Sequence, residues 1–377
     1  MKRYITLVVV LAIVTGCGSP VAYYKSGYKY EKDGKYAKAI EMYNKSLKHD
    51  SGYALSYFGL GSIYAKNGRW NEALSNLLEA QKLGIGDDEF HMLLGSVYES
   101  LGQMDKAAEE YGRAIKERPD DVYAHLKLGS NLEKSGDYES ALNEYNAAIA
   151  IAIDFYEAYF HSARILFHLG RYKEAEDTYQ QALKLKNDYA PAQNNLTVLY
   201  LETKQIRTAF ESASKTLEMD KGYVPGIVNM GIVCEIMGDE SSAEKYYNRA
   251  TETDSEYAMG HYRLGLLLMK KKRNDEARRE LELTVMANPD FAPAYNELGI
   301  LLLESGNFTD SLDHLKNAVR IDSTYAVAYY NMAGIYSNRG NYRNAVVSYE
   351  EYLKYAPESE DSEEVLARIK ILRSAQR

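Results

Sequence analysis

Apolar and small residues recur along most of the chain, against a polar background, at intervals of 34 residues. Residues 57–64, Tyr-Phe-Gly-Leu-Gly-Ser-Ile-Tyr, align with residues 91–98, His-Met-Leu-Leu-Gly-Ser-Val-Tyr, at an offset of 91 − 57 = 34. Glycines form two series at this offset, one from Gly27 to Gly299 and one from Gly34 to Gly340. A third series consists of Ala39, Ala73, Ala107, Ala141, Ala175, Ala209, Ala243, Ala277 and Ala345, with Ser311 in its one gap. A fixed period of this length predicts a stack of similar structural units.

The residue types within each period predict two packed helices. A small residue at the eighth position and alanine at the twentieth let two helices approach closely. Aromatic residues at positions 4, 11 and 24 fill the space around that contact. Glycine at position 15 ends the first helix, where a left-handed backbone is required. Such a unit buries its apolar faces only when neighbouring units stack on it.

This pattern resembles the tetratricopeptide repeat, with an aromatic residue at position 4, Leu-Gly at 7 and 8, Tyr at 11, Ala at 20 and 27, an aromatic residue at 24 and Pro at 32. Ten copies run without insertion, at 20–53, 54–87, 88–121, 122–155, 156–189, 190–223, 224–257, 258–291, 292–325 and 326–359. The resemblance implies an all-α fold, a right-handed α-solenoid of helix-turn-helix pairs. Residues 360–377 are expected to form a C-terminal capping helix whose apolar stripe comprises Val365, Leu366, Ile369 and Leu372.

Two copies depart from the pattern. In repeat 190–223, Lys204 stands where the other repeats have the turn glycine, and Thr197 replaces the glycine at position 8. In repeat 258–291, Lys272 replaces the turn glycine. We expect these changes to alter local geometry and to leave the fold intact.

The N-terminus carries a different pattern. Lys2 and Arg3 precede an apolar run from Ile5 to Val14 that only Thr6 interrupts. The run is too short for a membrane-spanning helix, which needs about 20 residues, and it is typical of a signal peptide. It ends in Val14-Thr15-Gly16-Cys17, which resembles a bacterial lipobox.

The lipobox resemblance implies that residues 1–16 are a lipoprotein signal peptide and that 17–19 form a lipidated N-terminus. Acylation of Cys17 with several chains would give stable membrane anchoring. Gly18, rather than aspartate, follows Cys17, which is similar to the outer-membrane sorting pattern of Gram-negative lipoproteins. We therefore expect a protein anchored in the outer membrane and facing the periplasm. An ordinary cleaved secretory signal is the alternative.

Composition narrows the function classes. A net charge of −9 argues against a general nucleic-acid binder. Two cysteines cannot supply a disulfide framework. The 35 tyrosines, against 8 phenylalanines and 1 tryptophan, indicate one residue type recurring at fixed repeat positions.

Candidate residues for chemistry are better explained by packing. His91, His125 and His261 all occupy the aromatic position 4, and helices of neighbouring repeats lie about 10 Å apart. That separation prevents two of these histidines from sharing one zinc ion, whose ligands lie at about 2 Å. Cys234, at position 11, is expected to be a buried thiol. Gly-x-Ser-x-Gly, His-Glu-x-x-His and Walker motifs are absent. We expect no catalytic residue, metal, cofactor or small-molecule substrate.

In the tetratricopeptide family the first helix of each repeat, helix A, lines a concave groove. Position 5 of that helix is unusually apolar here, and exposed apolar surface with aromatic residues is typical of binding sites. The alternative is that neighbouring repeats bury these side chains. The predicted partner-binding residues are Tyr24, Tyr28, Phe58, Met92, Tyr123, Leu126, Phe160, Asn194, Tyr262, Asn296 and Tyr330.

Two functions fit these expectations. The first is a lipid-anchored scaffold that binds segments of envelope proteins, resembling lipoproteins that assist assembly of a pilus or secretin machine. The second is a bridging subunit of a polysaccharide synthesis or export complex. The partner's identity does not follow from the sequence, because the repeat positions specify the scaffold.

Overall fold

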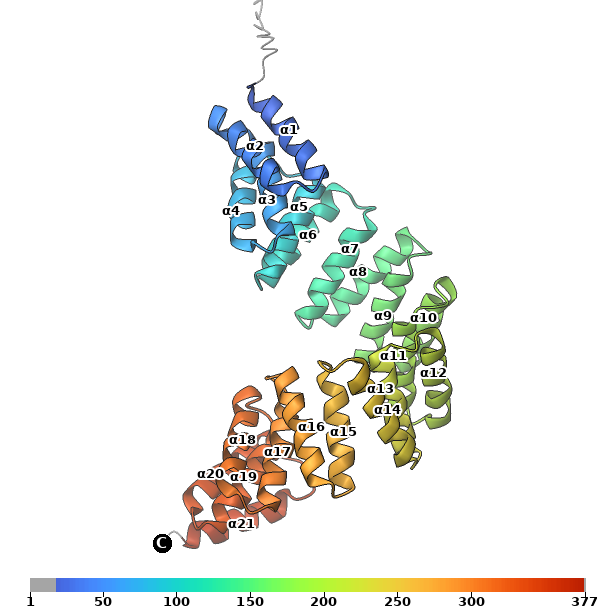
Figure 1. Cartoon of the computed structure of the whole chain (residues 1–377), viewed down its shortest axis with the longest axis vertical. Helices are drawn as coiled ribbons and strands as arrows, with labels where there is room; N and C mark the ends of the chain where they lie inside the picture. Colours follow the sequence, from blue (N-terminus) through green and yellow to red (C-terminus); the bar gives the residue numbers. More distant parts are fainter. Residues whose placement is uncertain (1–17, 376–377) are drawn as a thin grey trace, which may run out of the picture. The chain divides into compact units, whose positions relative to one another are not determined.

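A computed structural model describes residues 18–375, and within that range the chain folds into 21 α-helices. The predicted signal peptide and the lipobox cysteine, Cys17, lie outside the described residues. The chain divides into two compact units, Met1–Asn187 and Asp188–Arg377. Within each unit, consecutive helices pack as antiparallel pairs that stack side by side (Figure 1).

The first unit contains five helix pairs, each first helix beginning at the predicted first residue of a repeat. Their bounds are α1 Pro20–Lys32 and α2 Tyr36–His49, α3 Ala54–Lys66 and α4 Trp70–Lys82, α5 Asp88–Ser100 and α6 Met104–Glu117, α7 Val122–Lys134 and α8 Tyr138–Ile151, α9 Tyr156–His168 and α10 Tyr172–Leu185.

The second unit contains five more pairs and a final helix, which confirms the predicted all-α repeat fold. Their bounds are α11 Ala190–Glu202 and α12 Ile206–Met219, α13 Val224–Ile236 and α14 Glu240–Thr253, α15 Ala258–Lys270 and α16 Asn274–Ala287, α17 Ala292–Glu304 and α18 Phe308–Ile321, α19 Ala326–Asn338 and α20 Tyr342–Tyr355, then α21 Ser362–Ala375.

Local sequence explains where the helices begin and end. The Ser19 hydroxyl caps α1 by accepting the Ala22 N–H at 3.1 Å, and Asp121 caps α7 in the same way. Gly34, after α1, has φ +71°, the left-handed conformation that ends most first helices. Lys204 and Lys272 replace that glycine and still adopt φ of 59° and 57°. The two divergent repeats therefore keep the turn and hold a lysine in a conformation that costs L-residues energy.

The interior of each pair depends on small residues facing large ones. All nine alanines of the position-20 series are fully buried. A Cβ atom added to Gly95 would lie 2.7 Å from the Tyr111 ring, and Gly27 meets Tyr43 at the same distance. The small residue at position 8 therefore faces the large side chain at position 24, a pairing more specific than the predicted close approach of positions 8 and 20.

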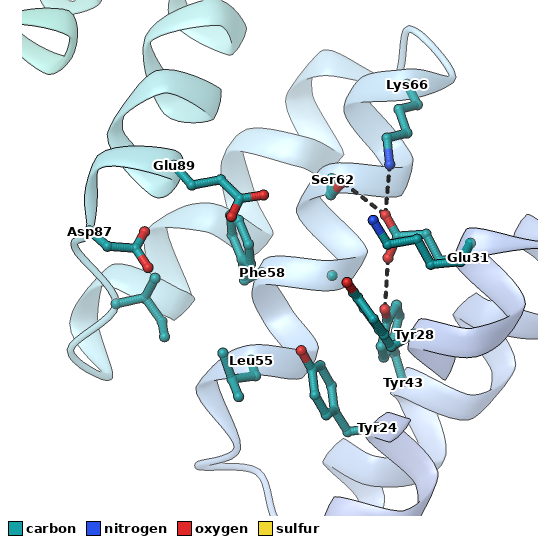
Figure 2. A pocket seen from close by; sticks show the side chains of 13 residues that line it. Tyr24, Tyr28, Glu31, Tyr43, Leu55, Phe58, Ser62, Lys66, Asp87 and Glu89 are labelled. Carbon is teal, nitrogen blue, oxygen red and sulfur yellow. Dashed lines mark hydrogen bonds and ion pairs between the residues drawn. The ribbon is translucent and has the colours of Figure 1, made fainter. Parts of the chain in front are cut away.

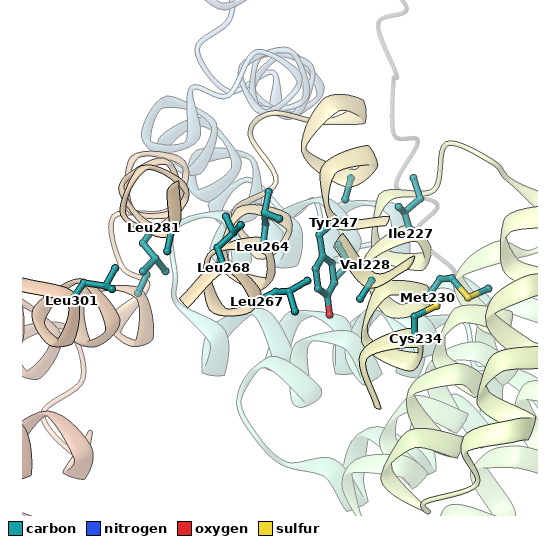
Figure 3. Close-up of a cluster of buried hydrophobic side chains, with 14 of the residues drawn as sticks. Ile227, Val228, Met230, Cys234, Tyr247, Leu264, Leu267, Leu268, Leu281 and Leu301 are labelled. Carbon is teal, nitrogen blue, oxygen red and sulfur yellow. The ribbon is translucent and has the colours of Figure 1, made fainter. Parts of the chain in front are cut away.

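The largest cluster of buried apolar side chains in the second unit runs through successive repeats (Figure 3). It joins Ile227 on α13, Tyr247 on α14, Leu267 on α15 and Leu281 on α16. Cys234 is buried in the same cluster, as predicted, and burial raises the pKa of its thiol. Because the cluster crosses repeat boundaries, each repeat depends on its neighbours for stability.

The final helix α21 packs on α20 through Val365, Ile369 and Leu372, all of which are buried. The inclusion of Leu366 in this stripe was wrong, because half of that side chain (50%) is exposed. Spacings of three and four residues put 365, 369 and 372 on one helix face, whereas residue 366 lies about 100° further around the helix.

Candidate functional site

A pocket of about 310 Å³ opens on the first unit, between α1 and α3 and beside the start of α5 (Figure 2). Helix A of the first two repeats supplies most of its wall, and the segment from α4 to α5 closes one side. Its lining residues are Tyr24, Tyr28, Glu31, Lys32, Tyr43, Leu55, Phe58, Gly59, Ser62, Lys66, Ile85, Asp87 and Glu89.

The carboxylate of Glu31, which already has three hydrogen-bond partners, forms the polar wall of this pocket. Glu31 accepts hydrogen bonds from the Tyr43 hydroxyl at 2.7 Å and the Ser62 hydroxyl at 3.0 Å, and it pairs with the Lys66 ammonium at 2.8 Å (Figure 2). Burial, and then the bond to Glu31, raise the pKa of Tyr43. Because its oxygens already have three partners, Glu31 joins α1, α2 and α3 and contributes little free acceptor capacity.

Aromatic side chains form the apolar part. The Tyr24 ring lies 5.8 Å from the Tyr43 ring and 6.3 Å from the Tyr28 ring. Phe58 lies on the facing helix, half-buried, with its ring 6.1 Å from that of Phe90. Tyr28 is 47% exposed. The structure therefore brings three of the predicted groove residues, Tyr24, Tyr28 and Phe58, to one pocket.

Two further carboxylates lie at the edge of the pocket. Asp87 caps α5 by accepting the Phe90 N–H at 2.9 Å. Glu89 is exposed and forms no ion pair with any residue in the range 18–375. The pocket thus combines aromatic and aliphatic side chains with a rim of mixed charge, on which Lys32 and Lys66 lie as well as Asp87 and Glu89.

The other predicted groove residues do not line this pocket, and their side chains range from buried to exposed. Met92, Leu126, Tyr262 and Tyr330 are half-buried, whereas Tyr123 is 65% exposed. Phe160 is only 8% exposed, and Asn194 and Asn296 are buried as well. Their part in partner binding stays a prediction.

The buried asparagines have a physical explanation in the next repeat. The Asn229 amide donates to the Asn194 carbonyl oxygen at 2.8 Å, and the Asn331 amide donates to Asn296 at 2.9 Å. In these repeats, position 5 is therefore covered by position 6 of the following helix A. This leaves less of each asparagine available to a peptide backbone than the sequence suggested.

Sequence reasoning missed a polar network that repeats along the groove. The Tyr at position 24 donates to a Glu at position 12 in four repeats, as the pairs Tyr43–Glu31, Tyr111–Glu99, Tyr145–Glu133 and Tyr247–Glu235, at 2.7 to 3.0 Å. In three of them a cation from the next repeat completes the network, namely Lys66, Lys134 and Arg164. The available signal was the recurring Glu-to-Tyr spacing of 12 residues.

The histidines at position 4 pack inside the repeats, as expected, but each also has a carboxylate partner. His91 lies 2.6 Å from Glu110, and His125 and His261 lie 2.7 Å from Glu144 and Glu280. The Glu280 hydrogen bond raises the pKa of His261. Within residues 18–375, no group of three or more His, Cys, Asp or Glu side chains converges as metal ligands would.

The family model of the tetratricopeptide repeat matches most of this chain. One such model matches residues 24–88, 66–122, 92–156, 126–190, 237–290 and 273–326, and a second matches 326–359. The chain belongs to the tetratricopeptide-repeat family. Residues 191–236, which include most of the divergent repeat 190–223, fall outside the matched ranges.

The chain is similar to several solved structures at low sequence identity. Yeast Tom70 has a TM-score of 0.57 and 15% identity, over 95% of this chain and 96% of its own. A tetratricopeptide repeat protein from Parabacteroides merdae has a TM-score of 0.54 and 17% identity, over 65% of this chain and 97% of its own. YrrB, a TPR protein with an unusual peptide-binding site, has a TM-score of 0.44 and 21% identity, over 46% and 89%. No curated protein sequence matches the chain.

Tetratricopeptide-repeat proteins bind other proteins and peptides, so this chain carries a protein-interaction fold. None of the helices in residues 18–375 is both long and apolar enough to cross a membrane.

Proposed function

We propose that this tetratricopeptide-repeat protein holds a segment of another protein along its helix-A surface and that the pocket at Tyr24, Tyr28 and Phe58 anchors the segment. The observation that carries this proposal is the open aromatic pocket of about 310 Å³. Pockets that hold small ligands begin at about 300 Å³ and use a few placed polar groups to orient the ligand. An aromatic or aliphatic side chain of the partner can pack against the tyrosine and phenylalanine rings, while the rim offers Glu89 to a basic group and Lys32 to an acidic one.

We further propose that the protein is anchored by lipid at Cys17 in the bacterial outer membrane, faces the periplasm and serves assembly of an envelope machine such as a pilus or secretin. The support is the order of charge, apolar run and lipobox in residues 1–17. Only Gly18 and Ser19 separate Cys17 from α1, a reach of about 10 Å at most. The repeat that carries the pocket would then lie next to the membrane surface. Catalysis has no part in this proposal.

The anchor is tested by metabolic labelling with palmitate and by membrane sedimentation in a bacterial host. The wild-type chain is expected to incorporate label and sediment with the outer membrane, and Cys17→Ser is expected to do neither. Cys234→Ser is the matched control, because it removes the other cysteine and leaves the lipobox intact. Equal labelling of wild type and Cys17→Ser would refute lipidation at this residue.

The pocket is tested by crosslinking in the native host and identification of captured proteins by mass spectrometry. A Tyr28→Ala, Phe58→Ala variant is expected to lose partners that the wild type captures. The control variant Leu83→Ala, Ile153→Ala removes exposed apolar side chains outside the pocket and is expected to keep them. Recovery of polysaccharide-export subunits in place of assembly subunits would favour the bridging role, and unchanged capture by the pocket variant would refute the site.

A further inference from the structure

The sixth residues of four successive repeats in the second unit are polar and half-buried: Asn229, Arg263, Glu297 and Asn331, here named the position-6 row. They lie on α13, α15, α17 and α19. The two asparagines at the ends of the row donate to asparagines of the preceding repeat, at 2.8 and 2.9 Å. The two charged residues in the middle, Arg263 and Glu297, form no such hydrogen bond to the preceding repeat within residues 18–375.

Arg263 has no acidic partner in the described part of the chain. Its Nε atom is buried without a hydrogen-bond partner, and the guanidinium forms no ion pair with residues 18–375. Glu235, on the preceding repeat, accepts a hydrogen bond from the Tyr247 hydroxyl at 2.9 Å. A half-buried arginine in this situation retains most of its capacity to bind a carboxylate.

Glu297 has no basic partner. Within residues 18–375, the one hydrogen bond to its carboxylate comes from the Asn296 amide at 3.0 Å. Burial raises the pKa of Glu297, which is the direction expected for a carboxylate without a compensating cation. Arg263 and Glu297 are therefore two opposite charges, on adjacent repeats, that do not pair with each other.

Tyr262 connects the two charges. Burial, and then the Glu297 carboxylate, raise the pKa of Tyr262 to about 12, whereas Arg263 acts in the opposite direction. The Tyr262 ring is half-buried and lies 4.9 Å from the Phe291 ring. A positive group, an aromatic ring and a negative group thus follow one another along the helix-A surface of this unit.

We propose that the position-6 row binds an extended segment of a partner protein in which an acidic residue faces Arg263 and a basic residue faces Glu297. Equivalent helices of neighbouring repeats lie about 10 Å apart, and a segment in the polyproline II conformation advances about 3.1 Å per residue and repeats its side-chain direction every three residues. The two charged residues of the segment therefore stand about three positions apart. This inference rests on the proposed function, because both assume that the chain binds a protein segment. The pocket lies in the first unit, whereas the position-6 row lies in the second.

Three peptides on one Gly-Ser-Ala background test this charge pattern, with Glu and Lys, Glu and Glu, or Lys and Lys three positions apart. Each is labelled, blocked at both ends and titrated with the full chain at low ionic strength, where charge interactions are least screened. The wild type is expected to bind the Glu/Lys peptide at least about fivefold more tightly than the others. Equal affinity for all three, or no binding at millimolar peptide, would overturn the proposal.

Charge-reversal variants make the test specific. Arg263→Glu is expected to prefer the Lys/Lys peptide, and Glu297→Lys the Glu/Glu peptide. Arg207→Glu makes the same charge change at a side chain that is 94% exposed on α12, and it is expected to keep the wild-type preference. If a reversal variant does not fold, as judged by circular dichroism, Arg263→Gln replaces it and is expected to lose the preference for Glu/Lys over Lys/Lys. A preference that the Arg263 variants leave unchanged would contradict the proposal.

The pocket variant Tyr28→Ala, Phe58→Ala distinguishes binding at the pocket of the first unit from binding at the position-6 row. It is expected to leave the peptide preferences unchanged, because both of its residues lie in the first unit. Loss of the preferences in that variant would show that the peptides bind at the pocket and not at the position-6 row.

Discussion

The Tyr43 hydroxyl donates a hydrogen bond of 2.7 Å to the Glu31 carboxylate, and so joins α2 to α1 in the first repeat. Lys66 on the next helix A pairs with the same carboxylate at 2.8 Å, so that one acidic residue connects two repeats. The relationship recurs at Glu99 and Glu133 with their own tyrosine and cation. These carboxylates hold neighbouring repeats in register at the surface where we propose that partners bind.

Removal of one phenol from this network should destabilise the repeat. Tyr43→Phe keeps the buried ring and deletes the bond to Glu31, and we expect the free energy of unfolding to fall by about 1–2 kcal/mol. Urea unfolding followed by circular dichroism measures the change. Tyr123→Phe removes a hydroxyl from a largely exposed ring and should change the midpoint very little. Equal effects of the two variants would contradict a structural role for the Tyr43–Glu31 bond.

Two glycines in the third repeat should respond oppositely to the same substitution. Gly95→Ala puts a Cβ 2.7 Å from the buried Tyr111 ring, and we expect a loss of about 1–3 kcal/mol from overpacking. Gly112 lies within α6 with no side chain or backbone atom near an added Cβ. Gly112→Ala should therefore raise stability by about 0.5–1 kcal/mol, because it lowers the entropy of the unfolded chain. Thermal unfolding of both variants checks the signs, and a stable Gly95→Ala protein would disagree with this packing.

The two lysines in left-handed backbone should be improved by glycine. Lys204 and Lys272 have φ near 60°, a conformation that costs an L-residue about 1–2 kcal/mol. Because glycine loses more chain entropy on folding, we expect Lys204→Gly and Lys272→Gly each to gain up to about 1 kcal/mol, measured by urea unfolding. Gly68→Lys is the reverse change at a turn with φ +70° and should destabilise. A loss of stability in both lysine variants would mean that the lysine side chains make stabilising contacts.

His261 should stabilise the fold at low pH. Its Nδ1 lies 2.7 Å from Glu280, and this hydrogen bond raises the histidine pKa above the ordinary value of 6.5. A raised folded-state pKa gives stability that is fully present below the unfolded pKa and lost as pH rises through the folded one. The difference in unfolding free energy between wild type and His261→Gln should therefore be largest below pH 6.5 and shrink as the pH rises above it. A difference that grows with pH would contradict the pairing.

His161 should destabilise the fold at low pH, in contrast to His261. Burial, and then the neighbouring Arg164, lower the pKa of His161 to about 4. The folded protein therefore resists protonation that the unfolded chain accepts, and stability falls as pH drops from 6.5 toward 4. NMR titration of the imidazole protons should place the midpoint of His161 well below that of His261. Similar midpoints for the two histidines would refute both assignments.

The sequence was sufficient to predict the helical repeat, but it was insufficient to predict the hydrogen bonds and ion pairs between its polar side chains. The close approach of the two helices at positions 8 and 20 could be predicted because small residues recur there every 34 residues, whereas the direct contact of Gly95 with Tyr111 appears only in the structure. The Glu31–Lys66 pair joins residues 35 apart through two side chains that are ordinary on any helix surface. Nothing in residue type distinguishes such a pair from two solvated charges.

The predicted groove residues differ in exposure, because the packing around them changes from repeat to repeat. Tyr24, Tyr28 and Phe58 share one pocket because α1 and α3 present the same face. Phe160 and Asn296 occupy the same repeat position as Phe58 and are buried. Coverage by the next helix A, as by Asn331 over Asn296, depends on the side chain one repeat further along. Repeat position alone therefore does not determine which groove residues are accessible.

Site-specific photocrosslinking in the native host tests the central claim, that the helix-A surface holds the partner, most directly. A benzophenone amino acid replaces Tyr28 at the pocket in one strain and Asn44, exposed on α2 and outside the pocket, in another. We predict that irradiation crosslinks a discrete protein from position 28 and not from position 44. Crosslinking of the same protein from position 44 alone, or equally from both positions, would contradict binding at the helix-A surface.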